Sequence, residues 1–297
     1  MNKFAKSLYE HFSQYLIILF LILASFNLIA QDSDESEYIE SVTIIGSKED
    51  LKNLAGSGAI ISNEDLQKAM DTDIQKILSA VPGLYMRTEE GYGLRPNISI
   101  RGTAIERSGK ITIMEDGVLV APAPYTASSA YYFPTTGRIH AVEVLKGPSA
   151  VPLGPQSIGG AINLISTPIP KVASGKFIQE IGENGMTRTH TYYGASQENF
   201  GALVEIHEHA SDGYDSIANV GGDTGFDKSD LMIKANYTSG NHLLTFKRVD
   251  LDETSNQSYV GLSQASFNAN PRMRYGATAY DKMMNDGEQT SLTYEGS

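Results

Sequence analysis

The sequence lacks cysteine and tryptophan, and basic residues are scarce. None of its 297 residues is Cys or Trp, and 35 Asp and Glu outnumber 23 Lys and Arg, giving a formal charge of −12. Without cysteine the chain can form no disulfide, no thiolate metal site and no cysteine nucleophile. The acidic balance also argues against a nucleic-acid partner, because proteins that bind nucleic acids need a basic face.

Familiar catalytic and nucleotide-binding motifs are missing too. Gly147-Pro148-Ser149 lacks the second glycine of a nucleophile elbow, and no Walker Gly-Lys-Ser/Thr occurs. Glu205, His207 and His209 share one strand face at a spacing that could bind a metal, but polar strand faces commonly carry such residues. We therefore expect no enzyme activity, no catalytic residue, no metal site and no cofactor.

The N-terminus has the features of an export signal. Lys3 and Lys6 precede an apolar run from Tyr15 to Leu23, and Ala30 is a small residue suited to cleavage before Gln31. The run is short for a spanning helix, which needs about 20 apolar residues. The sequence predicts a cleaved signal peptide at residues 1–30, with an uncleaved membrane anchor as the alternative.

An acidic arm and a short β-prone patch follow. Residues 31–40 hold five acids and no base, which predicts a solvated, disordered arm. The β-prone patch consists of Ser41, Val42, Thr43, Ile44, Ile45 and Gly46. Such a run beside a disordered arm can pair with the sheet of a partner as an edge strand, or it can be the first strand of the next domain.

Residues 50–170 have the pattern of a compact α/β region. Ser62 with Asp65, and Thr72 with Gln75, have the spacing of capping boxes and predict two helix starts. The second helix would carry its apolar residues on one face, namely Ile74, Ile77, Leu78 and Val81. Short strands are predicted at 98–101, 111–114, 142–145 and 161–165, separated by turn signals such as Asp116-Gly117.

After Pro170 the pattern changes to segments of about ten alternating residues. Phe200–Ala210, Leu231–Thr238 and His242–Val249 are the clearest examples. This alternation is typical of a membrane β-barrel, although a soluble β-sandwich alternates as well. Residues 171–297 have room for about five or six strands with loops.

Several short motifs occur in one order between Ile77 and Thr167. They are ILSAVPGL at 77–84, NISIRG at 97–102, MEDGV at 114–118, RIHAVEVLKGPSA at 138–150 and GGAINLIST at 159–167. This ordered set resembles the plug domain of the TonB-dependent receptors. The stretches at 125–134 and 138–170 are most similar to the ferric-dicitrate branch of that family.

The resemblance implies a fold for the chain from about residue 40 onward. It implies an α+β plug domain at 50–170 inside an antiparallel transmembrane β-barrel of about 22 strands. Residues 171–297 would hold only the first strands of that barrel, so we expect the chain to be a fragment of a longer protein. Residues 31–49 would be the arm that carries the TonB box, with Ser41–Gly46 as the strand that pairs with TonB.

The resemblance also implies contacts between plug and barrel. Arg101 and Lys146 each precede a glycine at the end of a predicted strand. In the family, basic residues at such places pair with barrel carboxylates, although an ordinary surface charge is the alternative. Lys146 departs from the commoner arginine and lacks its bidentate fork.

The ligand would bind at the apical loops of the plug, at residues 92–95, 103–110 and 121–132. Guanidinium forks and hydroxyls suit anionic, oxygen-rich chelates. The candidate ligand-binding residues are Arg95, Thr103, Arg107, Tyr125 and Tyr131. The alternative is that these side chains only pack the loops or face water.

Together these features predict a receptor of the outer membrane that actively imports a ferric chelate, ferric citrate or a similar siderophore. Its partners would be TonB, the cargo and outer-membrane lipid, with no nucleic acid. The alternatives are another cargo, such as haem, cobalamin or an oligosaccharide, or a signalling or adhesion protein that uses the plug without transport.

Overall fold

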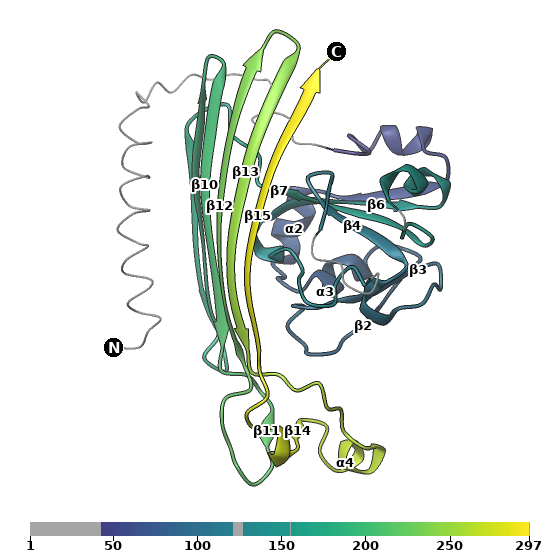
Figure 1. The fold of residues 1–297 in the computed structure, drawn as a ribbon, viewed down its shortest axis with the longest axis vertical. Coiled ribbons are helices and arrows are strands. Elements are labelled where there is room, and N and C mark those ends of the chain that lie inside the picture. The colour runs from purple at the N-terminus through teal and green to yellow at the C-terminus, as the bar shows by residue number, and fades with distance from the viewer. Residues whose placement is uncertain (1–42, 121–126, 155, 297) are drawn as a thin grey trace.

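The computed structural model of the chain describes residues 43–120, 127–154 and 156–296. The predicted signal peptide, the acidic arm at 31–40, Ser41, Val42 and Tyr125 lie outside the described residues. The remainder has two parts, an α/β region of short elements and a tall curved sheet against whose concave face that region packs (Figure 1). We call them the α/β region and the long sheet.

The α/β region alternates short strands with short helices. Its elements are η1 (Asp50–Asn53), β1 (Ser57–Ile61), α2 (Asn63–Ala69), α3 (Ile74–Ser79), β2 (Leu84–Arg87), β3 (Asn97–Ile100), η2 (Glu106–Ser108), β4 (Ile111–Glu115), β5 (Val118–Leu119), η4 (Thr136–Arg138), β6 (Ile139–Lys146), η5 (Pro148–Leu153) and β7 (Gly160–Ser166). All four strands predicted in this region are present, with ends shifted by at most three residues. One shift has a clear cause, since Arg101 adopts a φ of 55° and so ends β3 at Ile100.

The helix starts agree with the sequence in one case and differ in the other. Ser62 and Asp65 form the predicted capping box at the start of α2. The predicted cap Thr72 is wrong, because the carboxylate of Asp73 accepts the amide N–H of Gln75 at 2.9 Å and caps α3 instead. An Asp side chain reaches the second amide of a helix directly, so the helix begins one residue later.

The core of the α/β region lies between α3 and a five-stranded sheet. The strand order is β1-β6-β7-β4-β5, with β4 and β7 parallel and the other pairs antiparallel. The apolar face predicted for α3 is buried here, with Ile74 and Leu78 fully inaccessible. Every residue of β4 and β7 is buried, as expected for strands that are covered on both faces.

The long sheet is antiparallel and has six strands. They are β8 (Ser174–Ile181), β9 (Thr187–Gln197), β10 (Phe200–Ser211), β12 (Phe226–Ser239), β13 (His242–Ser255) and β15 (Met283–Gly296), in the order β15-β13-β12-β10-β9-β8. The three strands predicted from alternation are present and longer than expected. Because β15 and β8 are the two edges, the sheet is open and does not close into a barrel in this chain.

Short and long connections lie at opposite ends of the long sheet. β9 joins β10, and β12 joins β13, through two residues each, at 198–199 and 240–241. The other end carries longer loops, which contain β11 (Ser216–Ile217), α4 (Gln264–Ala269) and β14 (Met273–Arg274). These loops project below the sheet in Figure 1. We call this the loop end.

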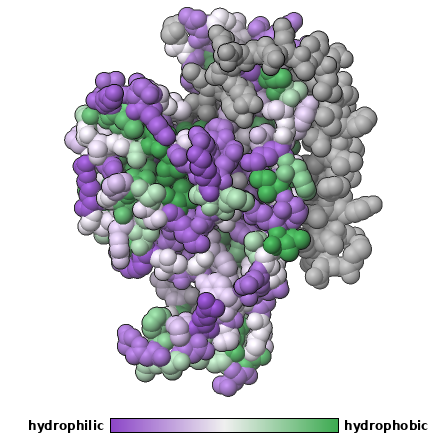
Figure 2. Space-filling view, turned by 180° about the vertical axis from the view of Figure 1, so that it is seen from behind, coloured by the Kyte–Doolittle hydropathy of each residue, from purple (hydrophilic) through white to green (hydrophobic). Residues whose placement is uncertain are grey.

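The two faces of the long sheet differ in character. Lys228, Asp230 and Lys234 of β12 alternate along the face that is buried against the α/β region. Tyr237 of β12 and Phe246 of β13 are large hydrophobic residues that are exposed. Seen from behind, the surface of the molecule carries apolar patches among hydrophilic side chains (Figure 2). No helix among the described residues has the length and hydropathy needed to cross a membrane.

Candidate functional site between the α/β region and the long sheet

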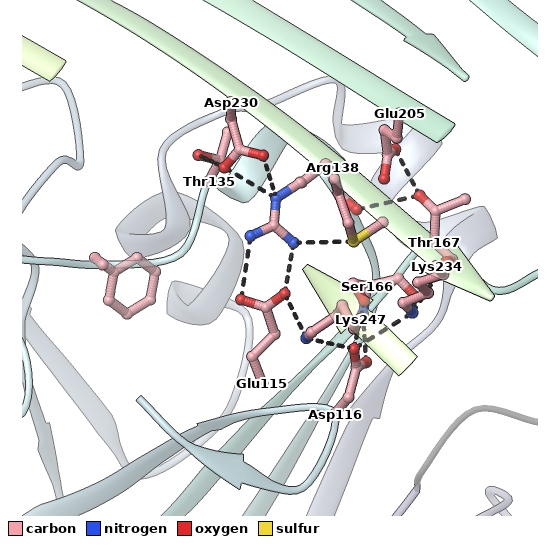
Figure 3. Close-up of polar contacts among 12 residues, drawn as sticks. Glu115, Asp116, Thr135, Arg138, Ser166, Thr167, Glu205, Asp230, Lys234 and Lys247 are labelled. Atoms are coloured by element: carbon pink, nitrogen blue, oxygen red, sulfur yellow. Dashed lines mark hydrogen bonds and ion pairs between the residues drawn. The ribbon is translucent and has the colours of Figure 1, made fainter. Parts of the chain in front are cut away.

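A tight turn brings two carboxylates to the long sheet. β4 and β5 pair through Met114–Leu119 and Glu115–Val118, so only Asp116 and Gly117 form the loop between them. Both have positive φ, 50° and 74°, as a two-residue hairpin of the primed type requires. The turn predicted from Asp116-Gly117 therefore exists, and it points Glu115 and Asp116 at β12 and β13 (Figure 3).

Arg138 lies at the centre of the contact and is fully buried. Its Nη1 and Nη2 donate to the two oxygens of Glu115 at 2.5 and 3.2 Å, a bidentate pair. Its Nε donates to Asp230 of β12 at 3.1 Å, and the hydroxyl of Thr135 donates to the same oxygen at 2.8 Å. One guanidinium thus connects a strand of the α/β region to a strand of the long sheet.

Two lysines of the long sheet complete this network. Lys247 Nζ lies 3.0 Å from Glu115 Oε1 and 2.7 Å from Asp116 Oδ2. Lys234 Nζ lies 3.3 Å from Asp116 Oδ2 and donates to the carbonyl of Thr167 at 3.1 Å. Ser166 holds Asp116 in place by donating its amide and hydroxyl, at 2.9 and 2.5 Å.

We call this set the interface network; its members are Glu115, Asp116, Arg138, Asp230, Lys234 and Lys247. Three cations face three anions, so the buried set is formally neutral. Charges taken out of water need such partners, and removing one partner from a buried pair typically costs about 3–5 kcal/mol. The network should therefore fix how the two parts sit against each other.

The carboxylates of the α/β region stay charged in this setting. Burial raises the pKa of Glu115, but the attraction of Arg138 and Lys247 outweighs it and brings the pKa down to about 2. The pKa of Asp116 is lowered as well, because Lys234 and Lys247 outweigh its burial. Both groups are therefore ionised at neutral pH, which the ion pairs require.

A second charged contact lies nearer the loop end. Arg95 is 6% exposed and forms an ion pair with Glu253 of β13, and its Nη1 donates to Gln257 at 3.3 Å. Lys228 of β12 lies 3.6 Å from the other oxygen of Glu253. The two parts are thus joined by ion pairs at two heights along the same sheet face.

Of the possible metal constellation on β10, Glu205 is engaged in other contacts, whereas the ring nitrogens of His207 have no hydrogen-bond partner among the described residues. Glu205 Oε1 accepts from Thr167 Oγ1 at 2.7 Å and lies 2.6 Å from His190 Nε2. Among the described residues no group of His, Asp and Glu could hold a metal ion. A small cavity lies beside this strand, lined by Thr72, Tyr92, Gly93, Leu94, 134–137, His207, His209 and Lys228.

The candidate ligand-binding residues have different surroundings. Arg95 is committed to Glu253, as described above, and Arg107 donates to both oxygens of Glu89 at 2.6 Å. Thr103 is half-buried and donates its hydroxyl to the carbonyl of Ile100. Tyr131 is 48% exposed.

Two contacts between the parts indicate where these loops lie. The carbonyl of Tyr131 accepts from Asn285, near the start of β15, and the hydroxyl of Tyr214 donates to the carbonyl of Glu90. Asn285 and Tyr214 both belong to the loop end. The loops at 88–95 and 127–132 therefore meet the long sheet at the loop end, and a ligand role for their side chains stays a prediction.

Arg101 and Lys146 have partners within the α/β region. Arg101 Nη2 donates to Ser57 Oγ at 3.0 Å, and Lys146 Nζ donates to the carbonyl of Pro82 at 2.9 Å. Burial and the nearby Arg101 lower the pKa of Lys146. Their predicted pairing with barrel carboxylates stays a prediction.

The described residues of the β-prone patch, 43–46, do not form a strand. They make a bend whose backbone amides reach the carboxylate of Glu143 on β6, at 2.8 Å from Ile44 and Ile45 and 3.1 Å from Gly46. Among the described residues the first strand is β1, so residues 43–46 are not the first strand of the domain. Pairing of the patch with a partner strand stays a prediction.

Sequence reasoning did not identify the interface network. Arg138, Glu115 and Asp116 lie inside recognised motifs, but their partners on the long sheet are far away in the chain. Asp230 is 92 residues from Arg138, and Lys247 is 132 residues from Glu115. The sequence offers one signal, which is that lysines and acids recur at alternate positions of β12 and β13 and therefore share one face of these strands. That pattern suggests a polar face but does not say which charges meet.

A family model matches part of the chain, and curated proteins are similar to it. Residues 50–161 match the TonB-dependent Receptor Plug Domain. The iron-regulated outer membrane virulence protein of Vibrio cholerae is 30% identical over 151 residues, 49% of this chain and 22% of that protein. The vitamin B12 transporter BtuB of Photobacterium profundum is 25% identical over 152 residues, 51% of this chain and 24% of that protein. Each match thus spans under a quarter of the relative.

Solved structures of a ferric citrate transporter and a ferric yersiniabactin uptake receptor share the fold. The ferric citrate transporter FecA in its unliganded form has a TM-score of 0.69 at 23% identity, over 89% of this chain and 40% of that one. The ferric yersiniabactin uptake receptor FyuA of Yersinia pestis has a TM-score of 0.60 at 19% identity, over 71% and 34%. The similarity extends beyond 50–161 and so includes part of the long sheet. The chain therefore carries a TonB-dependent receptor plug domain at residues 50–161, followed by antiparallel strands that have the fold of the start of a receptor barrel.

Proposed function

We propose that the protein is a TonB-dependent outer-membrane receptor that imports an iron chelate by transport and not by catalysis. The observation that carries this proposal is the plug domain at 50–161 seated on barrel-like strands through a buried network of ion pairs. A plug held by charges inside a sheet can block a channel and still be moved without exposing a large apolar core. The similar proteins include an iron-regulated outer membrane protein and a ferric citrate transporter, which supports iron as the cargo metal.

The cargo that we favour is ferric citrate or a similar siderophore. Support comes from the fold likeness to receptors for ferric citrate and ferric yersiniabactin. The binding surface would be the loop end, with Thr103, Arg107 and Tyr131 nearest to solvent, and Arg95 and Tyr125 as further candidates. For Arg107 to bind an anionic chelate, its pair with Glu89 would have to open or to share the guanidinium.

A second cargo has an observation in its favour. The relative at 25% identity is a vitamin B12 transporter, so cobalamin is the alternative to a siderophore. Haem and oligosaccharide, and a signalling or adhesion role without transport, stay as further alternatives without a specific observation behind them.

We also propose how the protein is exported and how TonB supplies energy for transport. Residues 1–30 would be removed as a signal peptide, and the strands after 170 would be part of a barrel in outer-membrane lipid. Ser41–Gly46 would pair with TonB as an added strand. Arg101 and Lys146 would contact carboxylates of the remaining barrel.

Uptake of radiolabelled cargo by the complete protein tests this function. Cells that depend on it should accumulate labelled ferric citrate and not labelled cobalamin, and the accumulation should require TonB. Accumulation of cobalamin alone would replace the siderophore by the alternative cargo. Absence of any uptake, with TonB binding intact, would favour the signalling or adhesion role.

The TonB box has its own test in Ile44→Pro. Proline removes the amide that a paired strand must donate and so should abolish uptake. Binding of the cargo at the cell surface should remain, because the loop end is untouched. Unchanged uptake in this variant would refute the placement of the TonB box.

A further inference from the structure

The carboxylate of Glu143 has an unusual set of partners. It is 2% exposed, and within the described part of the chain no cationic side chain forms an ion pair with it. Instead it accepts the amides of Ile44, Ile45 and Gly46, and the side-chain amide of Asn163 at 2.9 Å. A buried carboxylate without a cation needs such donors, because burial of an unpaired charge is costly.

The backbone of the bound segment is shaped to converge on this carboxylate. Gly46 has a φ of 86°, in the left-handed region that turns successive amides toward one anion. Directly after it, the hydroxyl of Ser47 donates to Asp50 at 2.6 Å and fixes the start of η1. The side chain of Ile45 is buried in a small apolar cluster with Met114, Leu145, Ala150 and Ala161. Hydrogen bonds and apolar contact therefore dock the same residues.

Docking on Glu143 uses the groups that strand pairing would need. An added strand is held by its backbone N–H and C=O groups, and alternate residues donate to one partner. While Ile44 and Gly46 donate to Glu143, they cannot donate to a partner strand. The docked and the paired states of residues 44–46 are therefore mutually exclusive at these amides.

Asn163 connects the docking site to the interface network. Its Oδ1 accepts the amide N–H of Gly117 at 2.9 Å, while its Nδ2 donates to Glu143. Gly117 belongs to the same two-residue turn as Asp116, which is paired with Lys234 and Lys247 of the long sheet. The orientation of the Asn163 amide is thus fixed by the turn that touches the barrel strands.

We infer that Glu143, oriented by Asn163, is a docking site that keeps residues 44–46 bound to the plug and withholds them from a partner strand until they are released. This inference rests on the proposed function of Ser41–Gly46 as the TonB box and adds the residues that control its availability. Glu143 acts on the segment directly, and Asn163 is a positioning residue.

Hydrogen–deuterium exchange tests the docking without any change in residues 44–46. In the complete protein, Glu143→Gln replaces the charged acceptor by a neutral amide with a single acceptor oxygen. The amides of 44–46 should then exchange faster by on the order of tenfold or more, because hydrogen bonds to a charged group are lost. Asn163→Ala should also raise the exchange rates of these amides, by a smaller factor.

Glu205→Gln is the matched control, since Glu205 is 1% exposed but does not touch residues 44–46. It should leave their exchange unchanged, and exchange in β4 should stay slow in all variants. Unchanged exchange of 44–46 in Glu143→Gln would overturn the inference. An equal rise in the exchange rates of 44–46 and β4 would also overturn it, because Glu143 would then stabilise the whole fold and not the segment in particular.

Binding of the isolated C-terminal domain of TonB separates this inference from the proposed function. Glu143→Gln should bind it more tightly than the unaltered protein without cargo. Faster exchange at 44–46 with no TonB binding in either protein would leave the docking site in place and refute the partner.

Discussion

The two sheets of this chain bury their strands in opposite ways. β4 and β7 of the plug are short, buried at every residue and partly parallel, whereas β12 and β13 have 14 residues each and alternate between two different faces. The plug is stabilised by an apolar core between α3 and its sheet, which Leu251 of β13 joins from the long sheet. Its contact with the long sheet relies largely on ion pairs. A polar contact surface can separate into water at lower cost than an apolar core, so this difference divides the chain into a stable unit and a separable boundary.

The strongest challenge to this division is Arg138→Met. The variant leaves Glu115 and Asp230 without their shared cation, and we expect a loss of about 3–5 kcal/mol in the stability of the packed plug. The loss is to be measured by urea unfolding, with protease resistance of the plug as a second readout. Arg87→Met, which removes an exposed pair with Glu106, should cost less than about 1 kcal/mol. Equal losses in the two variants would contradict a special role for the interface network.

Ile162→Ala addresses the other side of the comparison. Ile162 is fully buried on β7, and truncation of such a side chain should cost roughly 2–5 kcal/mol. The loss should appear as unfolding of the plug, measured as faster hydrogen–deuterium exchange of the β4 amides. Exchange of the β12 amides should stay slow. Phe177→Ala on the exposed face of β8 is the matched truncation and should leave the plug unaffected. Unfolding of both sheets together in Ile162→Ala would mean that they are one cooperative unit.

Acid should loosen the boundary before it affects the apolar core. The pKa of Glu115 is lowered from 4.5 to about 2, so its contribution to stability is present above pH 4.5 and is lost as the pH falls toward 2. The contribution of Glu115 to stability in urea should therefore be flat between pH 7 and 5 and should decline below about pH 4. In Arg138→Met this decline should be smaller, because the lowered pKa depends on that cation. A decline of the same size in the variant would exclude Glu115 as its main source.

Gly117→Ala should have the smallest effect. An alanine at a φ of 74° costs about 1–2 kcal/mol, and the strain falls on the turn that carries Asp116. Gly261→Ala is the control, since a Cβ there would meet no atom within 4 Å and its φ is not in the left-handed region. Thermal unfolding can compare the two. Equal stability of both variants would mean that the turn relaxes without strain.

The sequence predicted local features better than contacts between the two parts. The capping box at Ser62, the buried face of α3 and the turn at Asp116 depend on neighbours within a few residues, and all three are present. The cap at Thr72 failed because Asp73 beside it competes for the same amide. Such local competition between two good capping residues is hard to decide without coordinates.

The site itself was mostly out of reach of sequence patterns. Arg138 meets Asp230, and Glu143 meets Ile44, only because strands far apart in the chain come together. The β-branched residues 43–45 suggested a strand, but Ile44 and Ile45 form a bend in which Glu143 accepts their amides. Alternation predicted a strand at 231–238 but held no information on the partners of its side chains.

The position of β1 determines what a pulling force on the N-terminus would do. The amides of residues 44, 45 and 46 are bound in chain order to one side chain, so tension would reach them in succession and break them singly. The next ordered strand is β1, an edge strand held to β6 through five residue pairs, from Ser57–Lys146 to Ile61–Val142. Its detachment would leave β6, β7, β4 and β5 still paired. The plug could thus yield to traction in graded steps from its outermost strand, with its remaining sheet intact.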